Sequence, residues 1–103
     1  KELLPDNVII VDHLRANGHV YDSAIYPATQ RGLLRALVYI TAEELDMYPS
    51  DSISMTLRMI GCSLRVDLEA LLTDTSNLTI ITEDGSKSIV RIDELERALS
   101  ILS

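Results

Sequence analysis

The segment from residue 78 to residue 92 is the stretch whose local signals most constrain the fold. Two runs rich in Ile, Val and Thr flank Asp84-Gly85. This pair favours a type I′ turn, because both central positions of that turn have a positive φ. With these as the two loop residues, Ile81 is expected opposite Ser88. The segment therefore predicts a β-hairpin over residues 78–92.

A helix is expected directly after this hairpin. Asp93 can cap its N-terminus, and Glu96, three residues later, can reach back to the amide of the capping residue. The apolar residues that follow recur at helical spacing and would form one stripe, which comprises Leu95, Ala98, Leu99 and Leu102. Strand, tight turn, strand and helix is therefore the order expected over residues 78–103.

The first 26 residues give weaker signals. Pro5 and the short polar residues after it are typical of a helix start, and Asn17-Gly18 is typical of a helix end. The run from Val8 to Val11 between them is equally consistent with a buried strand of β-branched residues. We favour a helix here because its start and stop signals agree. Residues 19–26 alternate only weakly and are interpreted as irregular or as a short strand.

Residues 29–48 predict the most apolar helix of the chain. Thr29 can cap it, and Tyr48-Pro49 ends it. Gly32 lowers its stability by about 1 kcal/mol relative to Ala, and it serves either close packing or flexibility. A second capping pattern, Thr41 with Glu44, indicates that the helix breaks and restarts. The apolar positions recur at three- and four-residue steps and are Leu33, Leu34, Leu37, Val38, Ile40 and Leu45.

Residues 50–77 predict two short helices joined by a three-residue turn. Ser50 or Asp51 would open the first helix. Gly61-Cys62-Ser63 would then interrupt the chain, since Gly61 suits a left-handed helix end and Ser63 an N-cap. The apolar stripe of the first helix would consist of Ile53, Leu57 and Ile60, widened by Met55 and Met59. That of the second would consist of Leu64, Leu68, Leu71 and Leu72.

This order of elements resembles a winged helix-turn-helix domain, although no specific family is indicated. The resemblance rests on the two short helices about Gly61 and on the following hairpin, whose polar tip is typical of a wing, and it covers Ser50 to Ile92. It implies an α+β, mainly helical fold, namely a winged-helix-like bundle of four to five helices with one β-hairpin (78–92) and a C-terminal helix. Winged helices bind nucleic acids and also dock proteins, so this fold alone does not select a function.

Length and composition predict one intracellular domain. The 103 residues suffice for a single core, so residues 1–103 are expected to form one domain. The sequence begins at Lys1 without Met, which indicates a domain excised from a longer chain. A single cysteine excludes an internal disulfide, and no run approaches the ~20 apolar residues of a membrane span. We therefore expect a cytoplasmic or nuclear location and no membrane partner.

The charge of the chain argues against nucleic-acid binding without excluding it. The net charge is -7 and the pI is near 4.6, whereas phosphate-binding proteins depend on clustered Lys and Arg. On the second short helix, Arg65 and Glu69 are four residues apart and can pair with each other. A nucleic-acid binder would have to gather its basic side chains on one face, with Arg58, Arg65, Lys87 and Arg91 as candidates, joined by Arg31 and Arg35.

The sequence offers little for catalysis or for cofactor binding. His13 and His19 are six residues apart with no cysteine nearby, which does not match the ligand spacing of a zinc site. Cys62 could act as a nucleophile only with a histidine in contact, and a cysteine at this position is more often a small buried hydrophobe. Because no glycine-rich phosphate loop is present, we expect no catalytic residue, no cofactor and no metal.

Excess apolar surface is the remaining signal. The helix over residues 29–48 is apolar around most of its circumference, so it is either central in the fold or part of an interface. The candidates for partner binding are Leu34, Val38, Tyr39, Met55 and Met59. We expect a non-enzymatic module for protein-protein interaction or oligomerisation, as part of a larger regulatory or multi-subunit protein. The alternative is a winged-helix nucleic-acid-binding domain of a transcription regulator.

Overall fold

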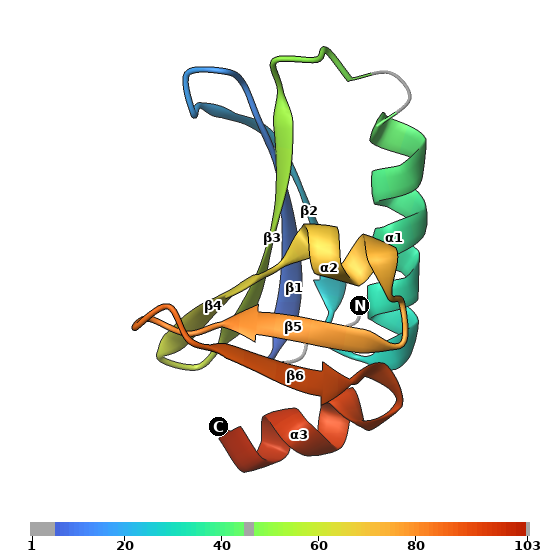
Figure 1. The fold of residues 1–103 in the computed structure, drawn as a ribbon, viewed down its shortest axis with the longest axis vertical. Coiled ribbons are helices and arrows are strands. Elements are labelled where there is room, and N and C mark those ends of the chain that lie inside the picture. Colours follow the sequence, from blue (N-terminus) through green and yellow to red (C-terminus); the bar gives the residue numbers. More distant parts are fainter. Residues whose placement is uncertain (1–5, 45–46, 103) are drawn as a thin grey trace.

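A six-stranded antiparallel sheet forms the centre of the molecule (Figure 1). The computed structural model of the chain describes residues 6–44 and 47–102. The strands lie side by side in the order β2-β1-β3-β4-β5-β6. Their bounds are Val8–Leu14 (β1), Val20–Pro27 (β2), Ser52–Met59 (β3), Cys62–Val66 (β4), Asn77–Ile81 (β5) and Lys87–Arg91 (β6). The sheet turns strongly along this order, so that β5 and β6 run across the direction of β1 and β3 (Figure 1).

Three α-helices and one 3-10 helix contribute to a single core on one face of this sheet. They are α1 (Gln30–Glu44), α2 (Leu68–Thr73), η1 (Ile92–Glu94) and α3 (Leu95–Leu102). α1 packs along β1 and β2, α2 lies against β5, and α3 lies beside β6 (Figure 1). The core is almost wholly aliphatic; its most deeply buried large side chains are Ile9, Leu33, Ile40, Met55, Leu57, Leu71, Leu78, Ile80, Leu95 and Leu99.

The helix predicted in the first 18 residues is wrong, and the strand alternative is correct. In β1, Ile9, Val11 and His13 are buried, while the residues between them are half-buried. This period of two marks a strand with one face on the core, and the β-branched side chains suit it. Residues 20–27, interpreted as irregular or as a short strand, form the long strand β2.

The two short helices predicted over residues 50–77 are also wrong. Residues 52–59 alternate strictly between polar and apolar side chains, and Met55, Leu57 and Met59 are buried in β3. Gly61, at φ +73°, lies in the turn between β3 and β4. Leu64 therefore lies in a strand and not in a helix. A helix does follow, as α2, but it is capped by Asp67 and not by Ser63.

The predicted hairpin forms, with a register that differs by one residue. Ile81 lies opposite Lys87 and not opposite Ser88. The amide of Gly85 donates to the carbonyl of Thr82, and Gly85 has a φ of +87°, so the loop contains three residues. Because side chains alternate along a strand, this shift moves each predicted partner to the other face of the sheet.

The predicted winged-helix-like bundle of four to five helices is therefore wrong, and the molecule is dominated by its sheet. Helices form in part at three of the predicted places, as α1 within residues 29–48, as α2 within residues 63–73 and as α3 after the hairpin. On α3, Leu95 and Leu99 are buried as expected, and the side chain of Leu102 lies outside the described residues. Asp93 does not act as the predicted N-cap; its carboxylate pairs with Arg91 at 2.8 Å.

Candidate functional site

The start of α1 is fixed tightly against the end of β2. The hydroxyl of Thr29 accepts a hydrogen bond from the amide of Gly32 at 2.9 Å, which is the predicted N-cap. A Cβ atom placed on Gly32 would lie 1.9 Å from the carbonyl oxygen of Pro27. Gly32 therefore serves close packing, and the backbone of α1 approaches β2 more closely than any other residue would permit.

The outer surface of α1 carries a shallow apolar groove beside β2. The inner face of the helix is buried, whereas Leu34 and Val38 are 48% and 71% exposed. Tyr39 from the helix and Tyr26 from β2 line the same groove. Arg31 and Arg35 complete its lining, so two cations border an otherwise apolar surface.

The strand beneath this groove, β2, forms an edge of the sheet. The amide of Ala28 donates to the carbonyl of Asn7 at 3.1 Å. Hydrogen-bonded and non-bonded pairs alternate along antiparallel strands, so the N–H and C=O groups of Ile25 and Ser23 point away from the sheet. The amide of Ser23 donates instead to the Asp22 carboxylate at 2.9 Å. In the part of the chain that the structure describes, no other strand pairs with this edge, so its outward main-chain groups are positioned to bind a further strand.

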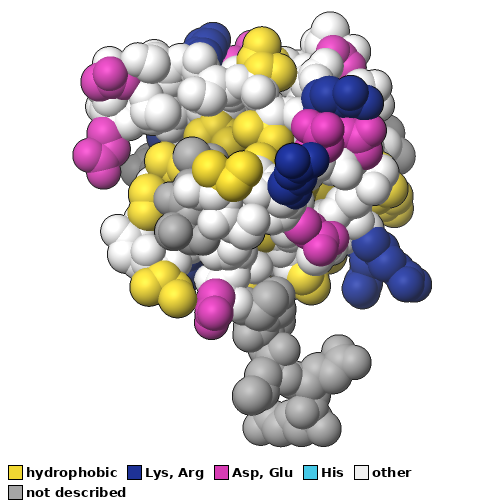
Figure 2. Space-filling model, turned by 90° about the horizontal axis from the view of Figure 1, so that it is seen from below, with side chains coloured by type: hydrophobic (Ala, Val, Ile, Leu, Met, Phe, Trp, Pro, Cys, Tyr) yellow, Lys and Arg dark blue, Asp and Glu magenta, His cyan; other side chains and the backbone are white. Residues whose placement is uncertain are grey.

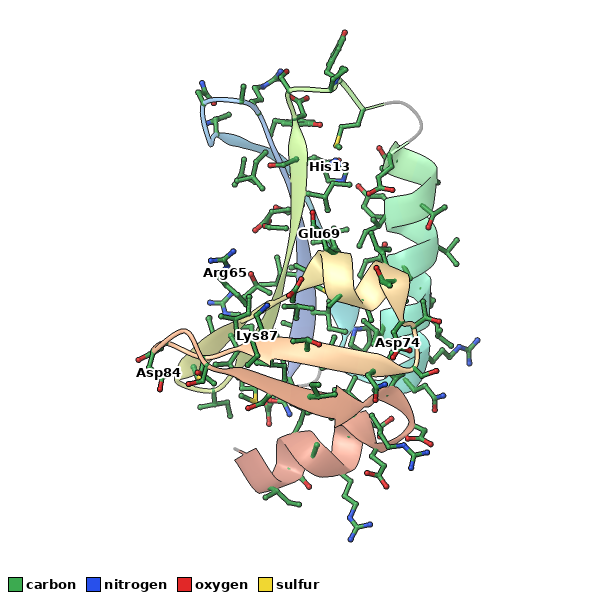
Figure 3. All side chains as sticks on the ribbon, in the orientation of Figure 1. His13, Arg65, Glu69, Asp74, Asp84 and Lys87 are labelled. Carbon is green, nitrogen blue, oxygen red and sulfur yellow. The ribbon has the colours of Figure 1, made fainter. Side chains whose placement is uncertain are left out.

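An aromatic cluster lies between β1, β2 and the second half of α1. The ring of His13 meets those of Tyr21 and Tyr39 edge to face, with centroids 5.7 and 5.5 Å apart. Figure 3 shows His13 between the sheet and α1. The Nε2 atom of His13 is buried and has no hydrogen-bond partner among the described residues. The cluster therefore anchors α1 on the sheet by packing.

Tyr39 joins this cluster to the edge strand. Its hydroxyl donates to a carboxylate oxygen of Asp22 at 3.5 Å, and its ring lies 6.3 Å from that of Tyr26. Burial, and then the negative charge of Asp22, raise the pKa of the Tyr39 phenol. The phenol is therefore neutral at physiological pH and can act as a hydrogen-bond donor.

The structure divides the five candidates for partner binding. Leu34, Val38 and Tyr39 come together in the groove on α1. Met55 and Met59 lie on β3 and are buried in the core, at 2% and 6% exposure. They face inward because the strand period places every second residue of β3 beneath the helices.

The four basic candidates of the nucleic-acid alternative share one face of the sheet. The register places Arg58, Arg65, Lys87 and Arg91 on the side opposite the helices. Figure 3 shows Arg65 and Lys87 on the side of the sheet away from α1. No aromatic residue lies on this face within the described strands, so it offers no stacking platform for bases.

Two of these four cations are already paired with carboxylates. Lys87 contacts Asp67 at 3.1 Å, and Arg91 contacts Asp93 at 2.8 Å. The predicted pairing of Arg65 with Glu69 does not form, because Arg65 is on β4 and Glu69 on α2. On the end of the molecule that carries α3, basic and acidic side chains lie beside one another and do not form separate fields (Figure 2).

The residues considered for catalysis or metal binding are not brought together. His13 pairs with Ile53 at the start of β3 and Cys62 with Met59 at its end. Six residues of strand, about 20 Å, separate these positions. Within residues 6–44 and 47–102, no three His, Cys, Asp or Glu side chains are grouped as metal ligands. The same residues contain no helix that is long and apolar enough to cross a membrane.

Two parts of this site were not assigned to it by the sequence reasoning. From the sequence, Arg31 and Arg35 are assigned only to phosphate contacts, although they precede Leu34 and Val38 by three residues each, which is helical spacing. The edge strand itself carried a readable signal, since four β-branched or aromatic residues occur among the eight of β2. Its position at the edge depends on long-range pairing, for which the local sequence has no signal.

Comparison of the sequence with protein-family models, with curated proteins and with solved structures found no significant match.

Proposed function

We propose that this chain is a non-enzymatic protein-association domain whose binding surface is the groove between α1 and β2. One observation carries the proposal, namely that large apolar side chains of α1 are exposed directly beside an edge strand whose main-chain groups point outward. Exposed apolar surface of this kind is typical of protein interaction sites. Strand edges are a common template for binding an extended segment.

The chemistry of the groove specifies what it would bind. Leu34, Val38 and Tyr26 offer apolar contact, while Arg31 and Arg35 favour a ligand that carries carboxylates. A partner with apolar residues flanked by acidic ones fits this surface.

Photo-crosslinking tests this proposal. A photoreactive amino acid replaces Val38 in the groove or, as a matched control, Ile60 in the turn between β3 and β4. Both side chains are highly exposed, at 71% and 76%. Irradiation in cells is expected to give discrete covalent adducts from position 38 and none of comparable yield from position 60. Equal labelling at the two positions would contradict the proposal.

The second candidate function is nucleic-acid binding through the open sheet face. It is supported by the register, which gathers Arg58, Arg65, Lys87 and Arg91 there. It is weakened by the two ion pairs to Asp67 and Asp93. A gel-shift titration at low salt with the wild type and with Arg58→Ala/Arg65→Ala tests it. Salt-dependent binding that the double substitution abolishes would support this function, and no binding by the wild type would exclude it.

A further inference from the structure

We infer that the groove between α1 and β2 is occupied by a second copy of this chain, in a two-fold symmetric dimer that joins two β2 strands. The inference rests on the proposed function and specifies its partner. A symmetric dimer requires a surface that is complementary to itself. If one residue of the first copy contacts another residue of the second, the same two residues also make contact with the copies exchanged. The main chain of β2 and the charges on α1 each satisfy this requirement. The contrast between the two edges of the sheet selects β2 as the edge that pairs.

The two edges of the sheet differ in the features that normally prevent pairing. β6 has five residues, begins with Lys87 and ends with Arg91. Short, basic edge strands resist edge-to-edge association. β2 has eight residues and only one charged side chain, that of Asp22. The β2 edge therefore lacks most of the protection that β6 possesses.

The main chain of β2 is arranged for antiparallel pairing with itself. The N–H and C=O groups of Ile25 and Ser23 point outward, as the hydrogen bond from Ala28 to Asn7 establishes. When the two-fold axis passes beside Ala24, Ile25 of each copy lies opposite Ser23 of the other. There is one such pair on each side of the axis, and each pair exchanges two main-chain hydrogen bonds. The Asp22 carboxylate releases the amide of Ser23 in this step and becomes free for another contact.

The same axis brings the two α1 helices together in an antiparallel arrangement. α1 lies over β1 and β2, so the axis of the helix lies above the midpoint between these strands. The two-fold axis lies half a strand spacing beyond β2, so the two axes are about 5 Å apart. The two helices would then be about 10 Å apart, which is an ordinary helix packing distance. Tyr39 contacts Asp22 and Tyr26 on either side of Ala24, which places the second half of α1 beside the axis.

The charges of α1 are self-complementary in this arrangement. The first half of the helix presents Arg31 and Arg35, and the second half ends with Glu43 and Glu44. The exposed Val38 lies between these groups, and the exposed Leu34 lies within the basic half. In an antiparallel pair, the basic half of each helix lies against the acidic half of the other, and the Val38 side chains of the two copies meet at the centre.

One interchain ion pair follows from the register. With the axis beside Ala24, Asp22 of one copy lies opposite Tyr26 of the other. Arg35 lines the same groove as Tyr26, so it lies within reach of the partner copy's Asp22. The dimer contains this contact twice, between Arg35 and Asp22 of opposite copies.

A charge-swap experiment tests the dimer. Arg35→Glu and Asp22→Lys are purified separately, and each is followed by sedimentation over about 1 to about 100 µM protein, because dimerisation depends on concentration. Each single variant places like charges at both contacts and is expected to dimerise about tenfold or more weakly than the wild type. An equal mixture restores both contacts in a mixed dimer and is expected to return to within about threefold of the wild-type affinity.

The controls separate this inference from a folding defect and from the proposed function. All altered side chains are exposed, so both variants should keep the wild-type circular dichroism and, at concentrations where the wild type is monomeric, its melting midpoint. Arg97→Glu on α3 is the matched charge reversal away from β2 and should leave dimerisation unchanged. A monomeric wild type at about 100 µM, or a mixture as weak as the single variants, overturns the dimer. If position 38 still gives adducts with a different protein, the association surface stands and only its occupant is wrong.

Discussion

Gly32 gives the sharpest test of how α1 is held on the sheet. Replacing a glycine in a helix by alanine normally stabilises the helix by about 1 kcal/mol. At Gly32 the added Cβ would lie 1.9 Å from the carbonyl oxygen of Pro27, and real Cβ contacts are essentially never below 3.0 Å. The backbone of α1 must therefore move away from β2 by about 1.1 Å, the difference between these two distances.

This displacement affects a fully buried part of the core. The neighbours of Gly32 on α1, Leu33 and Ala36, are both fully buried, and the capping hydroxyl of Thr29 would lie 3.2 Å from the new Cβ. Overpacking a core costs about 1–3 kcal/mol, and a weakened N-cap adds about 1 kcal/mol. After subtracting the gain of about 1 kcal/mol in helix propensity, we expect Gly32→Ala to lower the free energy of unfolding by about 1–3 kcal/mol.

Urea unfolding followed by circular dichroism measures this effect. For a domain of this size, the loss corresponds to a fall of about 4–24 °C in the melting midpoint. Ala42→Gly, at an exposed position of the same helix, isolates propensity and should cost about 1 kcal/mol or less. If Gly32→Ala is as stable as the wild type or more stable, the close approach of α1 to β2 does not exist and the reasoning fails.

Three further predictions follow from the described contacts. His13→Leu should raise the free energy of unfolding by about 1 kcal/mol in urea titrations, because it removes a buried, unpartnered nitrogen; clear destabilisation would contradict this. The hydrogen bonds from the Thr82 hydroxyl and then from the Ser86 amide lower the pKa of Asp84 to about 2. The stabilisation that these bonds give the hairpin is therefore present above about pH 4 and is lost as the pH falls towards 2. The Ser86 amide shift should titrate with a midpoint near 2, and a midpoint near 4 would refute the assignment. Asp67→Ala should increase hydrogen exchange in α2 more than Asp67→Asn, since asparagine retains the cap; equal effects would assign the role to the Lys87 pair.

Local sequence signals predicted those elements whose structure depends on nearby residues. Thr29 caps α1 as expected because the capping bond spans only three residues. The hairpin at Gly85 was located because its turn needs a positive φ. Its register was off by one because Thr82, Asp84 and Ser86 bond one another and stabilise a three-residue loop over the two-residue one.

The strands were missed where two periodicities coexist in the same residues. In β3, Ile53, Leu57 and Ile60 fit a helical stripe, whereas Met55, Leu57 and Met59 fit the period of a strand. The strict polar-apolar alternation over residues 52–59 favours the strand, and pairing with β1 and β4 decides it. Such pairing is formed with residues far away in the sequence, so it overrides the helical propensity of Met and Leu.

Part of the candidate site was also predictable. The exposed Leu34 and Val38 followed from an excess of apolar residues on one helix, which does not depend on the rest of the fold. Met55 and Met59 could not be placed correctly, because the assumed helix puts Ile53, Leu57 and Ile60 at the centre of its core stripe and leaves the two methionines at the margin. The role of β2 as an edge strand arises only from the order of strands in the sheet.

The difference between the two edge strands also determines how far association can proceed. A sheet with two receptive edges could add copies one after another and grow into a fibre, because each addition exposes a new edge of the same kind. Here the union of two β2 edges leaves only β6 strands at both ends, each bordered by Lys87 and Arg91. Growth would therefore stop at two copies, because the basic residues of β6 prevent a further strand from pairing with that edge.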